Sequence, residues 1–256
     1  MNKIVIVNNL KYKKILQDIS FRIENGEFIV ISGPNNCGKT TLMRILNRDL
    51  IVEEDIRING LNLNSYKIEE FNKIVQLVVP KEFIPIENCL EEELLLINNN
   101  PTIVAHILKL LKLQTIARKK WQQLNLREKI LSQIAIALIK GPEILLLDGI
   151  GYYLEEKETI KIMEALKKWQ ELTKITIIMT TLNLKESLYS DYLYIIENGT
   201  IVLQGKPVEV LEKDNIINKI GLNIPFMVDL SVKLKDYNLV DSIELIPEKM
   251  VENLWN

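Results

Sequence analysis

Residues 33–41 read GPNNCGKTT, a stretch whose residue types and spacing suit the binding of a nucleoside triphosphate. The spacing satisfies G-x-x-x-x-G-K-[ST], in which backbone N–H groups surround the phosphates and a helix N-terminus adds a favourable dipole. In this motif the lysine, here Lys39, reaches the β- and γ-phosphates, and the hydroxyl of Thr40 binds Mg²⁺. The candidate phosphate-binding residues are Gly33, Asn35, Asn36, Cys37, Gly38, Lys39, Thr40 and Thr41. The alternative is a glycine-rich turn that occurs by chance.

Two further residues are candidates for the same site. Asp148 ends the apolar run ILLL at residues 144–147, and an acidic residue at the end of such a strand holds Mg²⁺ through water in phosphate-loop proteins. An ordinary acidic residue at a strand end is the alternative. Tyr12 precedes the phosphate loop and is a candidate for stacking on an adenine ring, although surface tyrosines are also common.

The elements around these residues have the pattern that a phosphate loop requires. Residues 28–32 form a short β-branched run before the loop, and Leu42, Ile45 and Leu46 recur at helical spacing after it. Residues 144–147 and 175–179 are continuous apolar runs separated by a helical pattern, which is typical of parallel strands buried on both faces. The expected order is therefore strand, loop, helix, with the second apolar run in the same sheet.

Shorter patterns complete the expected organisation. Residues 4–7, 19–23 and 56–58 read as further strands, and Asn198-Gly199 predicts a hairpin between residues 192–197 and 200–204. The pattern from about residue 69 to residue 140 is mostly helical and suggests a helical insertion. From residue 206 onward we expect short helices.

Composition excludes several classes of protein. The chain has 32 basic and 34 acidic residues in 256, a net charge of −2, so no overall positive field favours nucleic acid. The N-terminus has four consecutive apolar residues, too few for a signal peptide, and no run approaches the length of a membrane-spanning helix. The two cysteines, Cys37 and Cys89, have no metal-ligand spacing, and we expect free thiols. We expect a cytoplasmic chain that reaches a membrane only through partners.

The chain resembles the ATP-binding subunit of ABC transporters over nearly its whole length. The resemblance rests on the segments ILQDISFRIENGEFIVISGPNNCGKTTLMRIL, PEILLLDGIGYYLE and IIENGTIVLQGKPVEVL. The tail segments GLNIPFMVDLSVKLK and SIELIPEKMVENLW are similar to the C-terminal extension of energy-coupling-factor ATPases, which drive vitamin and metal-ion uptake.

The resemblance implies an α/β fold, a P-loop NTPase core with an N-terminal antiparallel β part. It places an ABC-type domain at residues 1–205, with a helical subdomain at about 73–140, and a dimerisation-type extension at 206–256. It also implies ATP and Mg²⁺ as ligands and head-to-tail dimers that hold two nucleotides. The partners would be a second ABC-type ATPase subunit, an integral membrane component and a substrate-binding membrane subunit, without nucleic acid.

The chain departs from the family's pattern at most of the remaining motifs. Residues 124–128, LNLRE, replace the LSGGQ sequence, so side chains stand where bare backbone approaches the partner's γ-phosphate. The other departures are Pro80 for the glutamine that senses Mg²⁺ and water, Gly149 for the catalytic glutamate, Glu155 for an aspartate, and Thr181 for the switch histidine. The sequence therefore predicts Mg-ATP binding with impaired hydrolysis, and pairing with a competent ATPase.

Three assignments stay open at the level of sequence. Arg127 is either a cation that faces the partner's γ-phosphate, with Asn125 beside it, or a solvated charge at a helix start. His106 lies on the apolar face of the helical region, and we expect a structural role for it. The rival function is a non-enzymatic scaffold or regulator. A soluble kinase or GTPase is disfavoured, because neither an Asn-Lys-x-Asp motif nor a lid arginine cluster is apparent.

Overall fold

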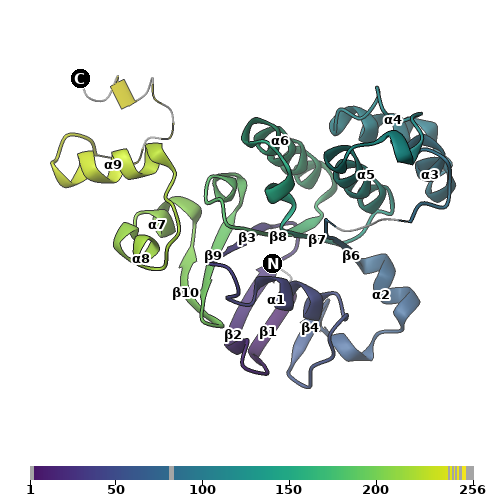
Figure 1. The fold of residues 1–256 in the computed structure, drawn as a ribbon. Helices are drawn as coiled ribbons and strands as arrows, with labels where there is room; N and C mark the ends of the chain where they lie inside the picture. Colours follow the sequence, from purple (N-terminus) through teal and green to yellow (C-terminus); the bar gives the residue numbers. More distant parts are fainter. Residues whose placement is uncertain are drawn as a thin grey trace.

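The computed structural model describes residues 3–80, 84–241, 243, 245, 247, 250 and 251. Within them, one sheet has the strand order β5-β4-β1-β2-β10-β9-β3-β8-β7-β6. Its strands are β1 (Lys3–Tyr12), β2 (Leu16–Glu24), β3 (Phe28–Ser32), β4 (Ile56–Ile58), β5 (Leu61–Asn62), β6 (Val75–Val78), β7 (Ile144–Asp148), β8 (Thr176–Thr181), β9 (Tyr192–Glu197) and β10 (Thr200–Gly205). Figure 1 shows this sheet with helices on both sides, which confirms the predicted α/β class.

The centre of the sheet is parallel and buried. β3 pairs in parallel with β8 and β9, β7 pairs with β8, and every residue of β3, β7 and β8 is buried. Helices α5 (Leu126–Ile139) and α6 (Glu156–Thr173) cover one face, and α1 (Lys39–Leu46) lies on the other (Figure 1). The continuous apolar runs of the sequence therefore form parallel strands, as predicted, because both faces are packed.

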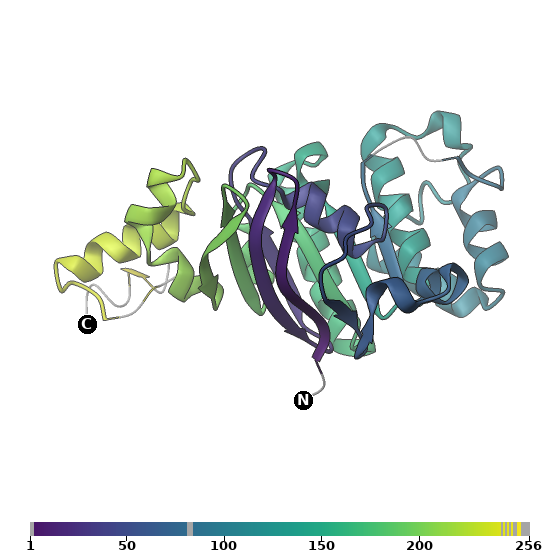
Figure 2. The same cartoon turned by 90° about the horizontal axis from the view of Figure 1, so that it is seen from below.

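The antiparallel part of the sheet encloses α1. β1 pairs with β2 and with β4, both antiparallel, and Figure 2 shows these strands in front of α1. The apolar face of α1, with Leu42, Ile45 and Leu46, is buried in the core between the two parts of the sheet. The predicted hairpin at Asn198-Gly199 joins β9 to β10, with both turn residues at positive φ. The helix that follows the phosphate loop is thus held by its apolar face, while Thr40 and Arg44 on its other face are exposed.

The helical region extends from one end of the sheet. It contains α3 (Leu90–Ile97), α4 (Pro101–Leu110) and the start of α5. The prediction of a mostly helical pattern from about residue 69 is wrong at β6, since residues Val75–Val78 follow α2 (Ile68–Ile74) and pair in parallel with β7. The four residues of β6, VQLV, are too few to distinguish a strand from a helix by periodicity. The helical part therefore begins after β6 rather than at about residue 73.

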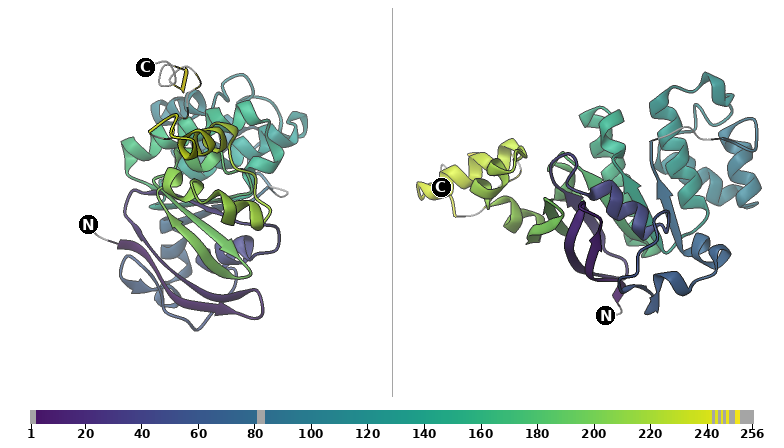
Figure 3. Two further views of the ribbon diagram at one scale, coloured as in Figure 1. Left: turned by 90° about the vertical axis from the view of Figure 1, so that its left-hand side faces the viewer. Right: turned by 60° about the horizontal axis from the view of Figure 1, so that its bottom comes forward.

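The C-terminal helices lie at the opposite end of the molecule. They are α7 (Pro207–Leu211), α8 (Asp214–Lys219) and α9 (Phe226–Asp236), far from α3 and α4 in Figures 2 and 3. Of the tail segment SIELIPEKMVENLW, residues 242, 244, 246, 248, 249 and 252–255 lie outside the described residues. No helix in the described part of the chain has both the length and the apolar character needed to span a bilayer.

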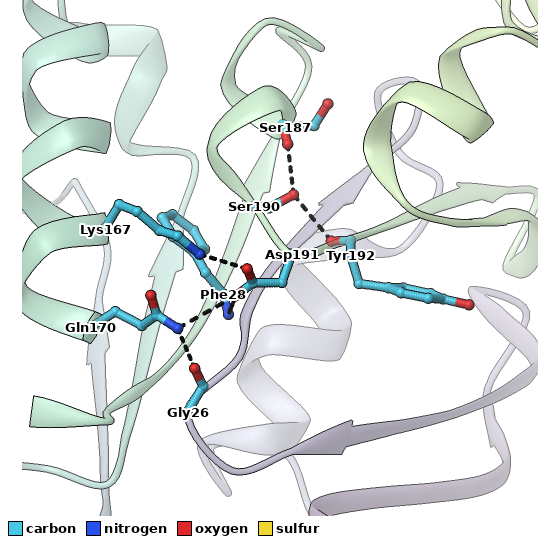
Figure 4. Close-up of polar contacts among 8 residues, drawn as sticks. All are labelled: Gly26, Phe28, Lys167, Gln170, Ser187, Ser190, Asp191 and Tyr192. Atoms are coloured by element: carbon cyan, nitrogen blue, oxygen red, sulfur yellow. Dashed lines mark hydrogen bonds and ion pairs between the residues drawn. The ribbon is translucent and has the colours of Figure 1, made fainter.

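A polar cluster lies at the start of β3, at the opposite end of the strand from the phosphate loop. The Asp191 carboxylate accepts a hydrogen bond from the backbone N–H of Phe28 at 2.8 Å and forms an ion pair with Lys167 of α6 at 2.5 Å (Figure 4). Gln170 of α6 donates to the carbonyl of Gly26 and, at 3.4 Å, to Asp191. The cluster therefore ties α6 and the start of β9 to the beginning of β3, the strand that leads into the phosphate loop.

Candidate functional site

The phosphate loop occupies the turn between β3 and α1. Gly33 has φ +151, and a Cβ there would lie 2.0 Å from the carbonyl oxygen of Ile196, so only glycine fits. Asn36 adopts the left-handed region at φ 63, which asparagine tolerates better than most residues. Gly38 precedes α1 as its N-cap residue. The loop backbone therefore has a fixed curved path whose N–H groups are available to an anion.

Lys39 is held inside the loop. Its Nζ donates to the carbonyl oxygens of Gly33 at 2.6 Å and Pro34 at 2.8 Å, and lies 3.6 Å from the Cys37 sulfur. Burial lowers the pKa of the Lys39 ammonium, whereas Cys37 and Asp148 act in the opposite direction. The ammonium is thus directed at the centre of the loop, where a phosphate would take over the role of these acceptors.

Two adjoining hollows open around the loop, with volumes of about 480 and 400 Å³. Lys39, Thr40 and Tyr152 line both of them. The larger is also lined by Arg44, Asp49, Leu77, Val79, Pro80, Asp148, Gly149, Tyr153 and Thr180, and the smaller by Ile15, Asn35, Asn36, Gly38 and Thr41. The predicted phosphate-loop residues and Asp148 are therefore brought together, with Gly33 and Cys37 buried beneath the loop surface.

Tyr12 lies at the end of β1, at the edge of this region. Its ring is half-buried against the core around α1, and the Lys13 ammonium lies 5.2 Å from the ring centroid. Ile15, rather than Tyr12, is among the residues that line the smaller hollow. Stacking of Tyr12 on an adenine ring stays a prediction.

Asp148 is positioned by the neighbouring strand. Its carboxylate is 8% exposed and accepts a 2.5 Å hydrogen bond from the hydroxyl of Thr180, which itself accepts from the N–H of Gly149 at 3.0 Å. Asp148 and Thr40 line the same hollow. Hydroxyl and carboxylate oxygens are the donors that Mg²⁺ prefers, so these two residues fit the ion.

The position after Asp148 is a glycine that lies against the ring of Tyr152. Gly149 has φ +64, and a Cβ added there would lie 3.0 and 3.1 Å from the ring atoms Cε2 and Cδ2 of Tyr152. Tyr152 belongs to the short 3₁₀ helix Ile150–Tyr153 and is 56% exposed. A side chain at residue 149 would therefore make a tight contact with the Tyr152 ring, which would have to shift.

Sequence reasoning missed a second carboxylate beside the site. Glu186 is 4% exposed, and burial raises its pKa to about 7, while a hydrogen bond from Thr181 acts in the opposite direction. A Cβ at Gly151 would lie 2.4 Å from Glu186 Oε1, so the absence of a side chain at Gly151 makes room for this carboxyl group. A hollow of about 350 Å³ links Glu186 and Thr181 to Gly149 and Tyr152. The sequence signal that could have indicated Glu186 is a glutamate that follows a buried strand.

Gln76 does not substitute for a glutamine at residue 80. Its side chain donates to the carbonyl of Asn72 and accepts a 3.0 Å hydrogen bond from Lys140. Pro80 lines the larger hollow but brings neither a donor nor an acceptor side chain. The edge of the site at β6 is therefore apolar in this chain.

The segment LNLRE forms the start of α5, and its polar side chains are used within the chain. The Asn125 side chain accepts from the N–H of Glu128 at 2.9 Å, and Glu128 accepts from the N–H of Asn125 at 2.9 Å, which is a capping box. Arg127 forms a 2.5 Å ion pair with Glu158 of α6. The Arg127 side chain is 42% exposed within this pair, and a role toward a partner's phosphate would require breaking the pair. Both interpretations of Arg127 stay predictions.

The structure also corrects the position of His106. Its imidazole is exposed on α4, and its ring centroid lies 5.7 Å from that of Trp169 on α6. The buried face of α4 instead contains Val104, Ile107 and Leu108. The apolar residues on either side of His106 suggested a buried face, but the helix turns the imidazole toward α6.

Fold and site together define a phosphate-loop nucleotide-binding protein. The loop follows one strand of a parallel sheet, and Asp148 ends a strand two positions away in the same sheet, as Figure 1 shows for β3 and β7. Residues 16–150, more than half of the chain, match the family model described as ABC transporter. The chain therefore belongs to the ABC transporter family and carries its ATP-binding domain.

Individual relatives agree with this assignment along the whole chain. The energy-coupling factor transporter ATP-binding protein EcfA1 of Lactobacillus delbrueckii subsp. bulgaricus is 27% identical, covering 94% of this chain and 90% of the relative. EcfA of Pediococcus pentosaceus is also 27% identical, covering 99% and 95%. The structure of cbiO1 from Clostridium perfringens, part of the ABC transporter complex cbiONQ, has a TM-score of 0.74 at 24% identity, covering 90% and 99%. The last likeness shows a shared fold.

Proposed function

We propose that this chain is the ATP-binding subunit of an energy-coupling-factor type uptake transporter, and that it binds Mg-ATP but hydrolyses it poorly. The observation that carries the proposal is the contrast within one site. Lys39, Thr40 and Asp148 line one hollow, whereas Gly149 and Thr181 bring neither the carboxylate nor the imidazole of the family's pattern. Binding groups are retained where hydrolytic groups are absent.

The expected loss of rate follows from the chemistry of hydrolysis. Phosphoryl transfer to water needs a group that orients the water and accepts its proton, and such groups contribute roughly 10²–10⁴-fold. Losses at several positions are not additive, so the prediction is a very slow turnover rather than a product of factors. Glu186 does not replace the missing glutamate directly, because its carboxyl group is buried beside Gly151 and Thr181.

The proposed assembly follows from the same asymmetry. In a head-to-tail dimer, a competent ATPase partner would supply its own phosphate loop and glutamate opposite the LNLRE segment of this chain, and turnover would occur there. The site on the phosphate loop of this chain would hold ATP as a clamp. The relatives that are energy-coupling factor transporter ATP-binding proteins support a place for this chain in such a transporter. We propose that the chain associates there with an integral membrane component at the cytoplasmic face and with a substrate-binding membrane subunit, for vitamin or metal-ion uptake.

The alternative is a non-enzymatic scaffold or regulator that uses the fold for nucleotide-dependent dimerisation. The capping box of Asn125 and the ion pair of Arg127 favour it, because these groups stabilise the chain itself rather than face a second nucleotide. Affinity purification from native membranes distinguishes the two functions. A transport subunit is expected to recover a second ATPase and an integral membrane protein, whereas a soluble regulator recovers neither.

Calorimetric titration with Mg-ATP tests the binding part of the proposal. Lys39→Ala should abolish binding, because the ammonium at the centre of the loop is lost. Lys168→Ala removes an exposed lysine of α6 and should leave binding unchanged. Phosphate release measured on the same preparations should be negligible for the isolated chain. Robust steady-state hydrolysis by the isolated wild-type chain would contradict the proposed impairment.

A further inference from the structure

Tyr152 lies at the junction of the hollows around the phosphate loop. Its side chain lines the larger hollow with Asp148, the smaller hollow with Asn35 and Asn36, and the third hollow with Glu186. The edge of its ring lies over the Cα of Gly149, within 3.0 to 3.1 Å of where a Cβ would stand. Tyr152 therefore contacts Gly149 and lines both hollows around the loop.

Groups from three parts of the chain affect the pKa of the Tyr152 phenol. Burial, followed by the electrostatic interaction with Asp148, Glu186 and Cys37, raises the pKa of Tyr152. Cys37 is in the phosphate loop, Asp148 ends β7 and Glu186 follows β8. A phenol in this position keeps its proton at neutral pH and acts as a hydrogen-bond donor.

A terminal phosphate would enter the space that this donor borders. Lys39 and Thr40 hold the β- and γ-phosphates and Mg²⁺ in phosphate-loop proteins, and both residues share each of the two site hollows with Tyr152. Two positions of the family's pattern offer no free donor there, since Pro80 has no donor and the Thr181 hydroxyl is hydrogen-bonded to Glu186. A triphosphate brings to Lys39 and Thr40 a γ-phosphate that a diphosphate lacks.

We infer that the hydroxyl of Tyr152 donates a hydrogen bond to the terminal phosphate of the bound triphosphate, so that this residue distinguishes ATP from ADP. The inference rests on the proposed binding of Mg-ATP at the phosphate loop. Gly149 is part of the same arrangement, because any side chain at that position would displace the ring. Tyr152, whose ring lies against Gly149 at the position of the family's catalytic glutamate, thus serves to recognise the nucleotide.

The test compares the dissociation constants of Mg-ATP and Mg-ADP for the full chain and its variants. Tyr152→Phe keeps the ring over Gly149 and removes only the hydroxyl, so it should weaken ATP binding about tenfold, the effect of one hydrogen bond to a charged acceptor. Binding of ADP should change less than about twofold, within the effect of a distant surface change. Tyr237→Phe, which removes a hydroxyl from a 77% exposed tyrosine after α9, should change neither constant.

The outcomes separate this inference from the proposed function. If the wild-type chain binds neither nucleotide, both fail. If the wild-type chain binds both nucleotides and Tyr152→Phe leaves their ratio unchanged, the role of Tyr152 is refuted while the proposed function stands. A Tyr152→Ala variant that binds ATP more tightly than the wild type would show that the ring obstructs the site, which also overturns the inference.

Discussion

The buried carboxyl group of Glu186 makes the stability of this protein depend on pH in a way that one substitution should remove. Glu186 is 4% exposed, and its Oε2 has no hydrogen-bond partner among the described residues. Burial raises its pKa from 4.5 to about 7. The folded state therefore retains a proton that the unfolded state releases between about pH 4.5 and pH 7.

The sign and size of the effect follow from this difference. Because the folded state binds more protons in that interval, the free energy of unfolding falls as pH rises through it, and the loss is complete above about pH 7. A difference of one in pKa corresponds to about 1.36 kcal/mol, so the full loss in the free energy of unfolding is about 3 kcal/mol. About 2 to 3 kcal/mol of it lies between pH 5 and pH 8.

Urea denaturation followed by circular dichroism at pH 5 and pH 8 measures the effect. Glu186→Gln keeps the volume of the side chain and cannot ionise, so its stability relative to the wild type should rise by about 2 to 3 kcal/mol from pH 5 to pH 8. Glu171→Gln replaces an exposed acid on α6 and should change the stability by no more than about 0.5 kcal/mol at either pH. A Glu186→Gln variant whose relative stability is the same at both pH values would refute the reasoning.

Two further predictions concern the frame of the site. Asp191→Ala should lower the free energy of unfolding by about 1–2 kcal/mol, because it leaves the N–H of Phe28 without its acceptor and removes the ion pair with Lys167; an unchanged urea midpoint would show that the cluster in Figure 4 is not stabilising. Gly149→Glu should cost about 1–2 kcal/mol through its positive φ and the displaced Tyr152 ring, without raising phosphate release. The control Gly149→Ala should lower the free energy of unfolding by the same amount. A clear gain of ATP turnover in Gly149→Glu, without any other substitution, would contradict the view that several hydrolytic groups are missing.

The parts of this protein that the sequence predicted are those with a local signal. The phosphate loop is a motif of fixed spacing, and residues 28–32 and 144–147 are apolar runs that need both faces covered, so they had to lie at the centre of a sheet. The turn at Asn198-Gly199 needs two residues at positive φ, which few other pairs adopt readily. In each case the physical requirement falls on neighbouring residues.

Only the tertiary structure decided what surrounds that loop. Glu186 lies next to Gly151 because η4 (Glu186–Tyr189) follows β8 beside the end of β7, a contact between residues 35 positions apart along the chain. Arg127 meets Glu158 because α5 and α6 pack on the same face of the sheet. Tyr152 covers Gly149 because the left-handed φ of the glycine starts a turn that brings the ring back over it. The sequence alone determined the loop whose motif predicts phosphate binding. Long-range packing determined which groups surround that loop, since no periodicity or spacing encodes a contact between separate elements.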